Sequence, residues 1–495
     1  MPHRFEMSHV AFDTFTDGLP LHRLEAKERI ELLCDPGSTH VIRSRVKSRR
    51  IGDRAQAGDG VVAASGEIAG RPVFCYAQDA RFVGGSLGEA QADTICRVLS
   101  LAGEARVPVI GLVESAGARV QEATAALGGY GRIFRMIVQL STLIPQISII
   151  SGMSAGGGSY APALTDFIVM TKGANMFLTG PQVVREAMSE DVTPQELGGP
   201  GVHSRNGVCQ FVVPTDIDAS FLARELLSYL PQNSLEPPPV SEPHPPPAEN
   251  PGVVVPRETR QVYDMRAVAH GIVDDGRLLE VSPRWARNMV TAFARIEGHP
   301  IGIVANQPRH MGGVIDAEAS QKAARFIATC NRFGLPLVVL VDTPGFLPGT
   351  REEKRAVIRH GASLLHAFAA ATVPKLTVVV RQAYGGAYIT MNSKDLGADF
   401  AFAWPRARIG IMGAQQAVGI IHRREIAAAE DPEAHRLELS ERYAAEHQNA
   451  HAAAQDGFVD EVIAPLETRA RLVAALKTLH AKGRATVHVT GGPVV

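Results

Sequence analysis

Two stretches of this sequence follow one pattern: LIPQISIISGMSAGGGSYAPALTD covers residues 143–166, and TVPKLTVVVRQAYGGAYITMNSKD covers residues 372–395. In each of them, a run of apolar residues leads directly into a cluster of glycines. Gly156 of the first stretch corresponds to Gly385 of the second, and the offset between matching positions holds from one end of the match to the other. A constant offset of this kind predicts an internal duplication.

The duplication extends toward the N-terminus of both stretches. VPVIGLVESAGARVQE at residues 107–122 corresponds to LPLVVLVDTPGFLPGT at residues 335–350, with nearly the same offset. The apolar runs of both copies are short, nearly continuous and rich in β-branched residues, which is typical of strands covered on both faces. Amphipathic stretches at residues 89–105 and 317–334 predict helices between those strands. Each copy is therefore expected to be an α/β domain of repeated βαβ units with parallel pairing.

The composition changes abruptly in the middle of the chain. Residues 230–256 contain ten prolines and very few residues that could be buried. Such a segment is typical of an extended linker. We therefore predict an N-terminal domain at 1–230, a proline-rich linker at 231–256 and a C-terminal domain at 257–495. A charged helical stretch at residues 423–450 is expected to form an exposed arm or to cover a neighbouring subunit.

Bulk properties exclude several classes of function. Fifty basic and fifty-one acidic residues give a net charge of -1, which argues against a nucleic-acid partner. The five cysteines contain no CxxC pair, and no group of residues has the spacing of metal ligands, so neither a disulfide framework nor a metal site is expected. No apolar run is long enough for a membrane span, and the N-terminus lacks the pattern of a signal peptide. These features predict a cytoplasmic protein without a membrane partner.

The glycine clusters have three possible explanations. A glycine-rich turn between a strand and a helix can bind a phosphate, can stabilise an oxyanion, or can serve packing alone. Neither cluster fits GxGxxG or GxxxxGK[ST], which weakens the phosphate interpretation. Ser154 and Ser159 flank the first cluster, but Ala383 and Ala387 occupy the corresponding region of the second, so a serine nucleophile is not repeated. Backbone N–H groups are therefore the candidate electrostatic element at both places.

Several long motifs closely resemble the carboxyltransferase β subunits of biotin-dependent acyl-CoA carboxylases. The resemblance runs from about residue 26 to about residue 478, and its motifs are SAGGGSYAPALTDF, TGPQVVREAMSEDVTPQELGG, GIVANQP, VDTPGFLPGT, IRHGASLLHAFAAATVPKLTVVVRQAYGGAYITMNSKDLGAD and AWPRARIGIMGAQQAV. This resemblance implies two tandem crotonase-like domains. It also implies that acyl-CoA binds the N-terminal domain, that biotin binds the C-terminal domain, and that the site lies between two subunits.

The same resemblance implies roles for particular residues. Gly156 and Gly157 correspond to the backbone pair expected to hold the thioester oxyanion. Gly386 and Ala387 correspond to the pair expected to hold the ureido oxygen of biotin. The reaction would transfer a carboxyl group from carboxybiotin to the α-carbon of an acyl-CoA through a thioester enolate, and no protein base would be required.

Further positions follow from the same motifs. Gly117 and Ala118 are expected to contact the substrate, and Gly385 and Tyr388 are expected to contact the cofactor. Ile389 occupies a position that helps to select the acyl chain in this family, and an apolar residue there favours an acetyl or longer apolar chain over strict use of propionyl-CoA. The alternative is that Ile389 only continues a buried wall.

The resemblance also implies cofactors and partners. Biotin would arrive as carboxybiotin on a separate carrier, because this chain has no biotinylation segment of its own. The CoA thioester would be the second ligand, and no metal is expected. The partners would be a biotin carboxylase or biotin carrier subunit and further copies of this chain, forming a hexamer as a trimer of dimers.

The sequence departs from the family pattern in places. Ala116 and Ala123 replace glycines beside the expected CoA site, and Lys354 and Arg355 replace an aromatic segment near the expected biotin channel. Two other functions therefore stay open. One is a decarboxylase or transcarboxylase that acts on malonyl- or methylmalonyl-type thioesters, with or without biotin. The other is a non-catalytic scaffold subunit that binds an acyl-CoA.

Overall fold

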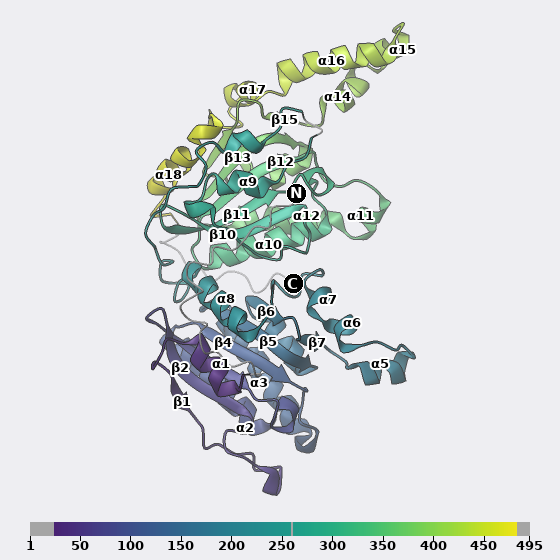
Figure 1. Ribbon diagram of the computed structural model, residues 1–495. Coiled ribbons are helices and arrows are strands. Elements are labelled where there is room, and N and C mark those ends of the chain that lie inside the picture. Colours follow the sequence, from purple (N-terminus) through teal and green to yellow (C-terminus); the bar gives the residue numbers. More distant parts are fainter. Residues whose placement is uncertain (1–23, 259–260, 483–495) are drawn as a thin grey trace.

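The computed structural model describes residues 24–258 and 261–482, and these form two β-sheets with helices on both faces (Figure 1). The first sheet has the strand order β1-β2-β3-β4-β5-β6-β8, with β7 paired to β5. Its strands are β1 (His40–Ile42), β2 (Val61–Ile68), β3 (Arg71–Gln78), β4 (Val109–Ser115), β5 (Gln146–Ala155), β6 (Phe167–Thr171), β7 (Asn175–Phe177) and β8 (Phe211–Val213).

The second sheet repeats this order, β9-β10-β11-β12-β13-β14-β16, with β15 paired to β13. Its strands are β9 (Leu279–Glu280), β10 (Met289–Ile296), β11 (His299–Asn306), β12 (Leu337–Thr343), β13 (Lys375–Tyr384), β14 (Phe400–Ala403), β15 (Arg408–Gly410) and β16 (Glu461–Val462). In both sheets the first three strands pair antiparallel and the later ones pair parallel. The duplication predicted from the sequence is therefore present in the topology.

The helices predicted between the strands are also present. The stretch at 89–105 forms α2 (Glu89–Ala105), and the stretch at 317–334 forms α10 (Ala317–Arg332). Each packs beside a second long helix, α3 (Thr124–Leu140) in the first half and α12 (Val357–Ala370) in the second. The remaining α-helices are α1 (Ala26–Leu33), α4 (Gly157–Ala163), α5 (Pro181–Met188), α6 (Pro194–Gly198), α7 (Pro200–His203), α8 (Asp216–Tyr229), α9 (Met265–His270), α11 (Thr350–Lys354), α13 (Gly385–Thr390), α14 (Ala414–Ile421), α15 (Arg423–Ala428), α16 (Pro432–His447), α17 (Ala450–Gln455) and α18 (Thr468–Thr478).

One hydrophobic core joins the two halves. The ring of Phe293 on β10 lies 5.8 Å from that of Phe167 on β6 and 5.7 Å from that of Tyr229 on α8. All three side chains are buried. Burial of aromatic side chains at such a contact strongly stabilises the packing of one half on the other.

The proline-rich segment follows the surface of the second half. Ser241 donates its N–H to the carbonyl of Gly298, and Arg295 donates to the carbonyl of Pro239. A Cβ atom on Gly298 would lie 2.0 Å from the carbonyl oxygen of Ser241, so only glycine allows this close approach. The proline-rich segment is therefore packed along the surface of the second half.

The charged stretch at 423–450 forms α15 and α16, which project from the top of the second half in Figure 1. Within the described residues, no helix is long and apolar enough to cross a membrane.

Candidate active site

Each half has a glycine at the junction between its longest parallel strand and a short helix. Gly156 follows β5 and precedes α4, and Gly385 follows Tyr384, the last residue of β13, and opens α13. The two glycines have φ angles of 56° and 57°. This left-handed conformation favours glycine, so the sequence requirement at both junctions has a direct structural reason.

The amide of Gly156 already has a partner inside the protein. Its N–H donates to the carbonyl of Phe177 at 3.0 Å, because β7 pairs with the end of β5. The ring of Tyr130 packs against Gly157, where a Cβ atom would lie 2.7 Å from ring carbons. Burial raises the pKa of Tyr130 to about 12, while hydrogen bonds from the Ser115 hydroxyl and the Gly158 N–H oppose that rise. The ring of Tyr130 therefore packs against the first residue of α4.

A second loop approaches each glycine cluster from the neighbouring strand. In the first half, Leu87 donates its N–H to the carbonyl of Gly117, and Arg119 donates its N–H to the carbonyl of Leu87. In such a parallel bridge, residues 117 and 119 face Leu87, so the N–H of Ala118 points to the other side. A Cβ atom on Gly117 would lie 3.2 Å from the carbonyl oxygen of Ala155, which places this loop against the end of β5.

The second half repeats this loop. Ile315 donates its N–H to the carbonyl of Gly345, and Leu347 donates its N–H to the carbonyl of Ile315. Phe346 therefore occupies the position that Ala118 occupies in the first half. The ring of Phe346 lies 3.9 Å from the position that a Cβ atom would take on Gly386. The sequence motifs identified Ala118 but missed Phe346. The nearly constant offset between the two copies relates Ala118 to Phe346, so it could have predicted Phe346.

Two buried amide side chains hold the strands that lead into these loops. The side-chain oxygen of Gln78 accepts the N–H of Glu114 at 3.2 Å, and that of Asn306 accepts the N–H of Asp342 at 3.2 Å. Both amides and both acids occupy matching positions in the two copies. This pair of interactions was not predicted, because a glutamine and an asparagine are not an obvious sequence match.

Asp342 is the centre of a buried polar group in the second half. Its Oδ2 accepts the hydroxyl of Tyr263 at 2.8 Å and lies 3.0 Å from Nε of Arg381. Burial raises the pKa of Asp342 to about 6, and the charge of Arg381 opposes that rise. The group fixes the end of β12, which leads into the loop that contains Phe346.

The residues around the second glycine cluster differ in exposure. Gly386 is exposed, Ala387 is buried, and Ile389 is 48% exposed. Tyr388 donates its hydroxyl to the carbonyl of Phe458 at 3.1 Å, and burial raises its pKa to about 12. The hydroxyl of Tyr388 is thus held by the protein itself, whereas Gly386 is exposed and an added Cβ there would only reach van der Waals contact with Phe346.

A cavity of about 1090 Å³ lies next to the strand that leads into this cluster. It is bounded by β13, by the segment between β14 and β15, and by α14 and α16. Four arginines contribute to its lining: Arg257, Arg381, Arg406 and Arg408. No group of three or more His, Cys, Asp or Glu side chains suited to a metal ion occurs in the described part of the chain.

The residues that depart from the family pattern lie near these elements. Ala116 and Ala123 are exposed residues of the loop after β4. Ala123 has φ 47° and ψ −128°, a conformation that strains any residue with a Cβ atom. Lys354 ends α11 and Arg355 follows it, and both are exposed.

Comparison with known proteins decides the family. The model of the carboxyl transferase domain matches residues 20–490. The chain belongs to the carboxyl transferase domain family. This carboxyltransferase is 47% identical over 475 residues to the carboxyltransferase subunit of propionyl-CoA carboxylase from Haloferax mediterranei, which covers 93% of this chain and 91% of the relative. It is 46% identical over 459 residues to the methylmalonyl-CoA carboxyltransferase 12S subunit of Propionibacterium freudenreichii subsp. shermanii, covering 91% and 88%.

Solved structures agree with the fold. The carboxyltransferase matches a transcarboxylase 12S crystal structure, described as a hexamer assembly with methylmalonyl-coenzyme A and methylmalonic acid bound, with a TM-score of 0.91. The match has 45% sequence identity and covers 95% of this chain and 92% of the other. The predicted family and the predicted pair of crotonase-like α/β domains are therefore confirmed, and the chain is an enzyme that transfers a carboxyl group.

Proposed function

We propose that this carboxyltransferase moves a carboxyl group from carboxybiotin, held on a separate carrier, to the α-carbon of an acyl-CoA. The single observation that supports this most strongly is the repeated pairing of a glycine junction with a strand-end loop, once in each half of a chain that belongs to this family. The repetition provides two sets of backbone N–H groups for two different carbonyl oxygens.

In the first half, the thioester oxygen would accept hydrogen bonds from backbone amides. The motif predicted Gly156 and Gly157 as the two donors. Since the Gly156 N–H donates to Phe177, we propose that Gly157 and Ala118 are the donors, and that Gly156 sets the direction of the turn. Fixed donors of this kind stabilise the negative charge of an enolate without reorganising during the reaction.

In the second half, Gly386 and Ala387 are proposed to hold the ureido oxygen of biotin. The fit is supported by the exposure of Gly386 and by the absence of a steric conflict there, since the nearest atom to an added Cβ would be a ring carbon of Phe346 at 3.9 Å. When bound, carboxybiotin supplies the CO₂ and a basic nitrogen for the α-proton. The protein orients both ligands, excludes water and stabilises charge on the two oxygens.

The partners are proposed to be a biotin carboxylase or biotin carrier subunit and further copies of this chain, in a cytoplasmic hexamer. Large apolar side chains are exposed near both clusters, among them Val120 and Leu127 in the first half and Ile411 and Ile420 in the second. Contact between the first half of one copy and the second half of another would bury them and bring the two clusters together. The name of the transcarboxylase structure, a hexamer assembly, supports this arrangement.

The test is a panel of acyl-CoA substrates mixed with the purified chain and a carboxybiotinylated carrier, with the transfer of labelled carboxylate as the measurement. Transfer that requires biotin supports the proposal. Release of CO₂ from malonyl-CoA or methylmalonyl-CoA without biotin would instead support a decarboxylase. Binding of acyl-CoA without any turnover would support a scaffold subunit, and both of these outcomes would contradict the proposal.

A further inference from the structure

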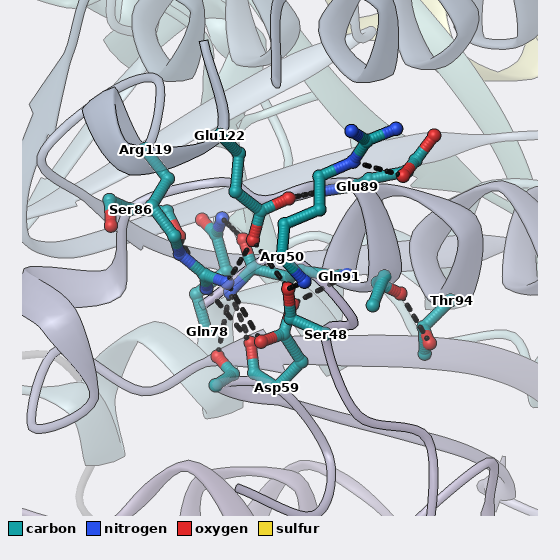
Figure 2. Close-up of polar contacts among 12 residues, drawn as sticks. Ser48, Arg50, Asp59, Gln78, Ser86, Glu89, Gln91, Thr94, Arg119 and Glu122 are labelled. Atoms are coloured by element: carbon teal, nitrogen blue, oxygen red, sulfur yellow. Dashed lines mark hydrogen bonds and ion pairs between the residues drawn. The ribbon is translucent and has the colours of Figure 1, made fainter. Parts of the chain in front are cut away.

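A buried cluster of three charged side chains, Asp59, Arg119 and Glu122, includes the residue that directly follows Ala118 in the chain (Figure 2). The guanidinium of Arg119 lies between two carboxylates, with Nη1 2.8 Å from Oδ1 of Asp59 and 2.8 Å from Oε1 of Glu122. All three side chains are fully buried. The second terminal nitrogen of the guanidinium, Nη2, donates to the carbonyl of Ser86 at 3.0 Å.

Glu122 connects this cluster to two further elements. Its Oε2 accepts the N–H of Glu89, the first residue of α2, at 2.7 Å, and its Oε1 accepts the hydroxyl of Ser48 at 2.8 Å. Gly88 precedes the helix, and a Cβ atom there would lie 2.4 Å from both Arg119 and Glu122. A side chain from the loop thus caps the helix in place of a residue of the helix itself.

In the second half, the start of the helix is capped and the matching carbonyl accepts a hydrogen bond without a cluster of this kind. Asp316, at the position of Gly88, caps α10 by accepting the N–H of Ala319 at 2.8 Å. The side-chain amide of Asn288 donates to the carbonyl of Val314 at 2.9 Å, in the place where Arg119 donates to Ser86. Leu347 occupies the position of Arg119. A helix cap and a satisfied carbonyl therefore do not require the buried charges.

The charged arrangement has an electrostatic cost. One cation faces two carboxylates in a region without solvent, and burial raises the pKa of Asp59 even though Arg119 opposes that rise. Replacement of buried charges by neutral groups is often neutral or stabilising. What the first half gains over the second is a link between the turn before β2, the start of α2 and the loop at 116–122, made by side chains of the loop itself.

We infer that Arg119 is a positioning residue that fixes the Ala118 amide in the orientation needed for the thioester oxyanion. This inference rests on the proposed function of that amide. The backbone N–H of Arg119 donates to the carbonyl of Leu87 at 2.9 Å, and its side chain is held by Asp59 and Glu122. Because Arg119 directly follows Ala118, these contacts restrict the orientation of the Ala118 backbone.

The test compares Arg119→Lys with wild type. Lysine keeps the charge but cannot form the planar fork that reaches Asp59, Glu122 and the Ser86 carbonyl together. We expect kcat for carboxyl transfer to propionyl-CoA to fall about 100-fold, which is the effect of misplacing one oxyanion donor. The dissociation constant for propionyl-CoA, measured by calorimetry without biotin, should stay unchanged, because the ground-state thioester depends little on that donor.

Arg71→Lys is the matched control. Arg71 also holds two carbonyls and one side-chain amide in the first half, those of Leu227, Leu230 and Gln232, but it does not contact the loop. The Arg71→Lys substitution should lower the thermal midpoint of unfolding without lowering kcat. Glu122→Gln provides a second variant of the cluster, and it should lower kcat less than Arg119→Lys while the affinity for propionyl-CoA is retained.

The outcomes separate the two proposals. If wild type transfers no carboxyl group, the proposed function fails. If wild type is active and the kcat of folded Arg119→Lys equals that of wild type, the positioning role is wrong. The positioning role would also be wrong if the loss of kcat in Arg119→Lys and Glu122→Gln merely followed the fraction of unfolded protein. Arg71→Lys shows how large that effect of unfolding is.

Discussion

The carboxylate of Asp166 lies 2.6 Å from the guanidinium of Arg332, and this ion pair joins the first half of the chain to the second. Asp166 also accepts the N–H of Gln146 at the start of β5. Its side chain is 4% exposed, and burial raises its pKa to about 6 while Arg332 opposes that rise. The folded state therefore binds this proton more tightly than the unfolded state, and stability falls as the pH rises from about 4 to about 6.

We expect Asp166→Asn to remove this dependence. The stability of wild type relative to the variant should decrease by about 2 kcal/mol between pH 4 and pH 6.5, since one pKa unit corresponds to about 1.4 kcal/mol and the carboxyl of the unfolded chain is already partly deprotonated at pH 4. Urea unfolding of both proteins at a series of pH values measures the difference. A difference that is independent of pH would contradict the raised pKa.

Lys322 should give a pH dependence of the opposite sign. Its Nζ donates to the carbonyls of Trp285 and Met289, and burial lowers its pKa to about 8. The unfolded state binds the proton more tightly here, so stability should rise between about pH 8 and pH 10.5. Relative to Lys322→Met, wild type should gain about 3 kcal/mol over that range. Parallel unfolding curves at pH 7.5 and pH 10 provide the test.

Ala123 and Gly156 allow a reciprocal experiment, because they share one backbone conformation. Their φ and ψ angles are 47° and −128° for Ala123, and 56° and −124° for Gly156. Ala123→Gly should stabilise the protein by about 1 kcal/mol, and Gly156→Ala should destabilise it by about 1–3 kcal/mol. Chemical denaturation measures both changes. Equal stability of all three proteins would show that neither position is strained.

The two glycine clusters should respond differently to a larger side chain. Gly157→Ala places a methyl group 2.7 Å from the ring of Tyr130, so it should cost about 1–3 kcal/mol of stability. Gly386→Val meets no atom closer than 3.9 Å at its Cβ, so the protein should fold and assemble normally but lose carboxyl transfer. Thermal unfolding and the transfer assay are measured together. Full activity of Gly386→Val would exclude Gly386 from the biotin site.

Ile389 provides a test of acyl-chain selection. Its side chain is half exposed on α13, beside the proposed biotin donors. Ile389→Asp should lower kcat/KM for butyryl-CoA relative to propionyl-CoA about tenfold, since a carboxylate is a poor neighbour for an added methylene. Competition between the two thioesters measures the ratio. An unchanged ratio would mean that Ile389 only forms part of the wall.

The sequence contained enough information for most of the fold. The β-branched runs at 107–113 and 375–381 overlap the parallel strands β4 and β13, and residues 89–105 form α2 with the expected limits. These elements were predictable because periodicity and strand composition are local properties. The exact limits of the two domains and the roles of the glycines stay predictions.

The parts of the site that could not be predicted depend on contacts between distant residues. Asp59 and Arg119 are separated by 60 positions, and nothing in either local motif marks them as partners. The bond from Gly156 to Phe177 depends on β7, a strand of three residues that lies outside the main order of the sheet. Charge pairs and short strands of this kind become visible only when the chain is folded.

The exchange of Gly88 for Asp316 at equivalent helix starts makes the two copies of the fold non-interchangeable. A chimaera that carried residues 344–350 in place of 116–122 would lose Arg119 and Glu122 together, which would leave Asp59 without its counterion and α2 without its cap. Any exchange of this corner between the two copies would therefore have to include Asp59 and the start of α2 together with the loop.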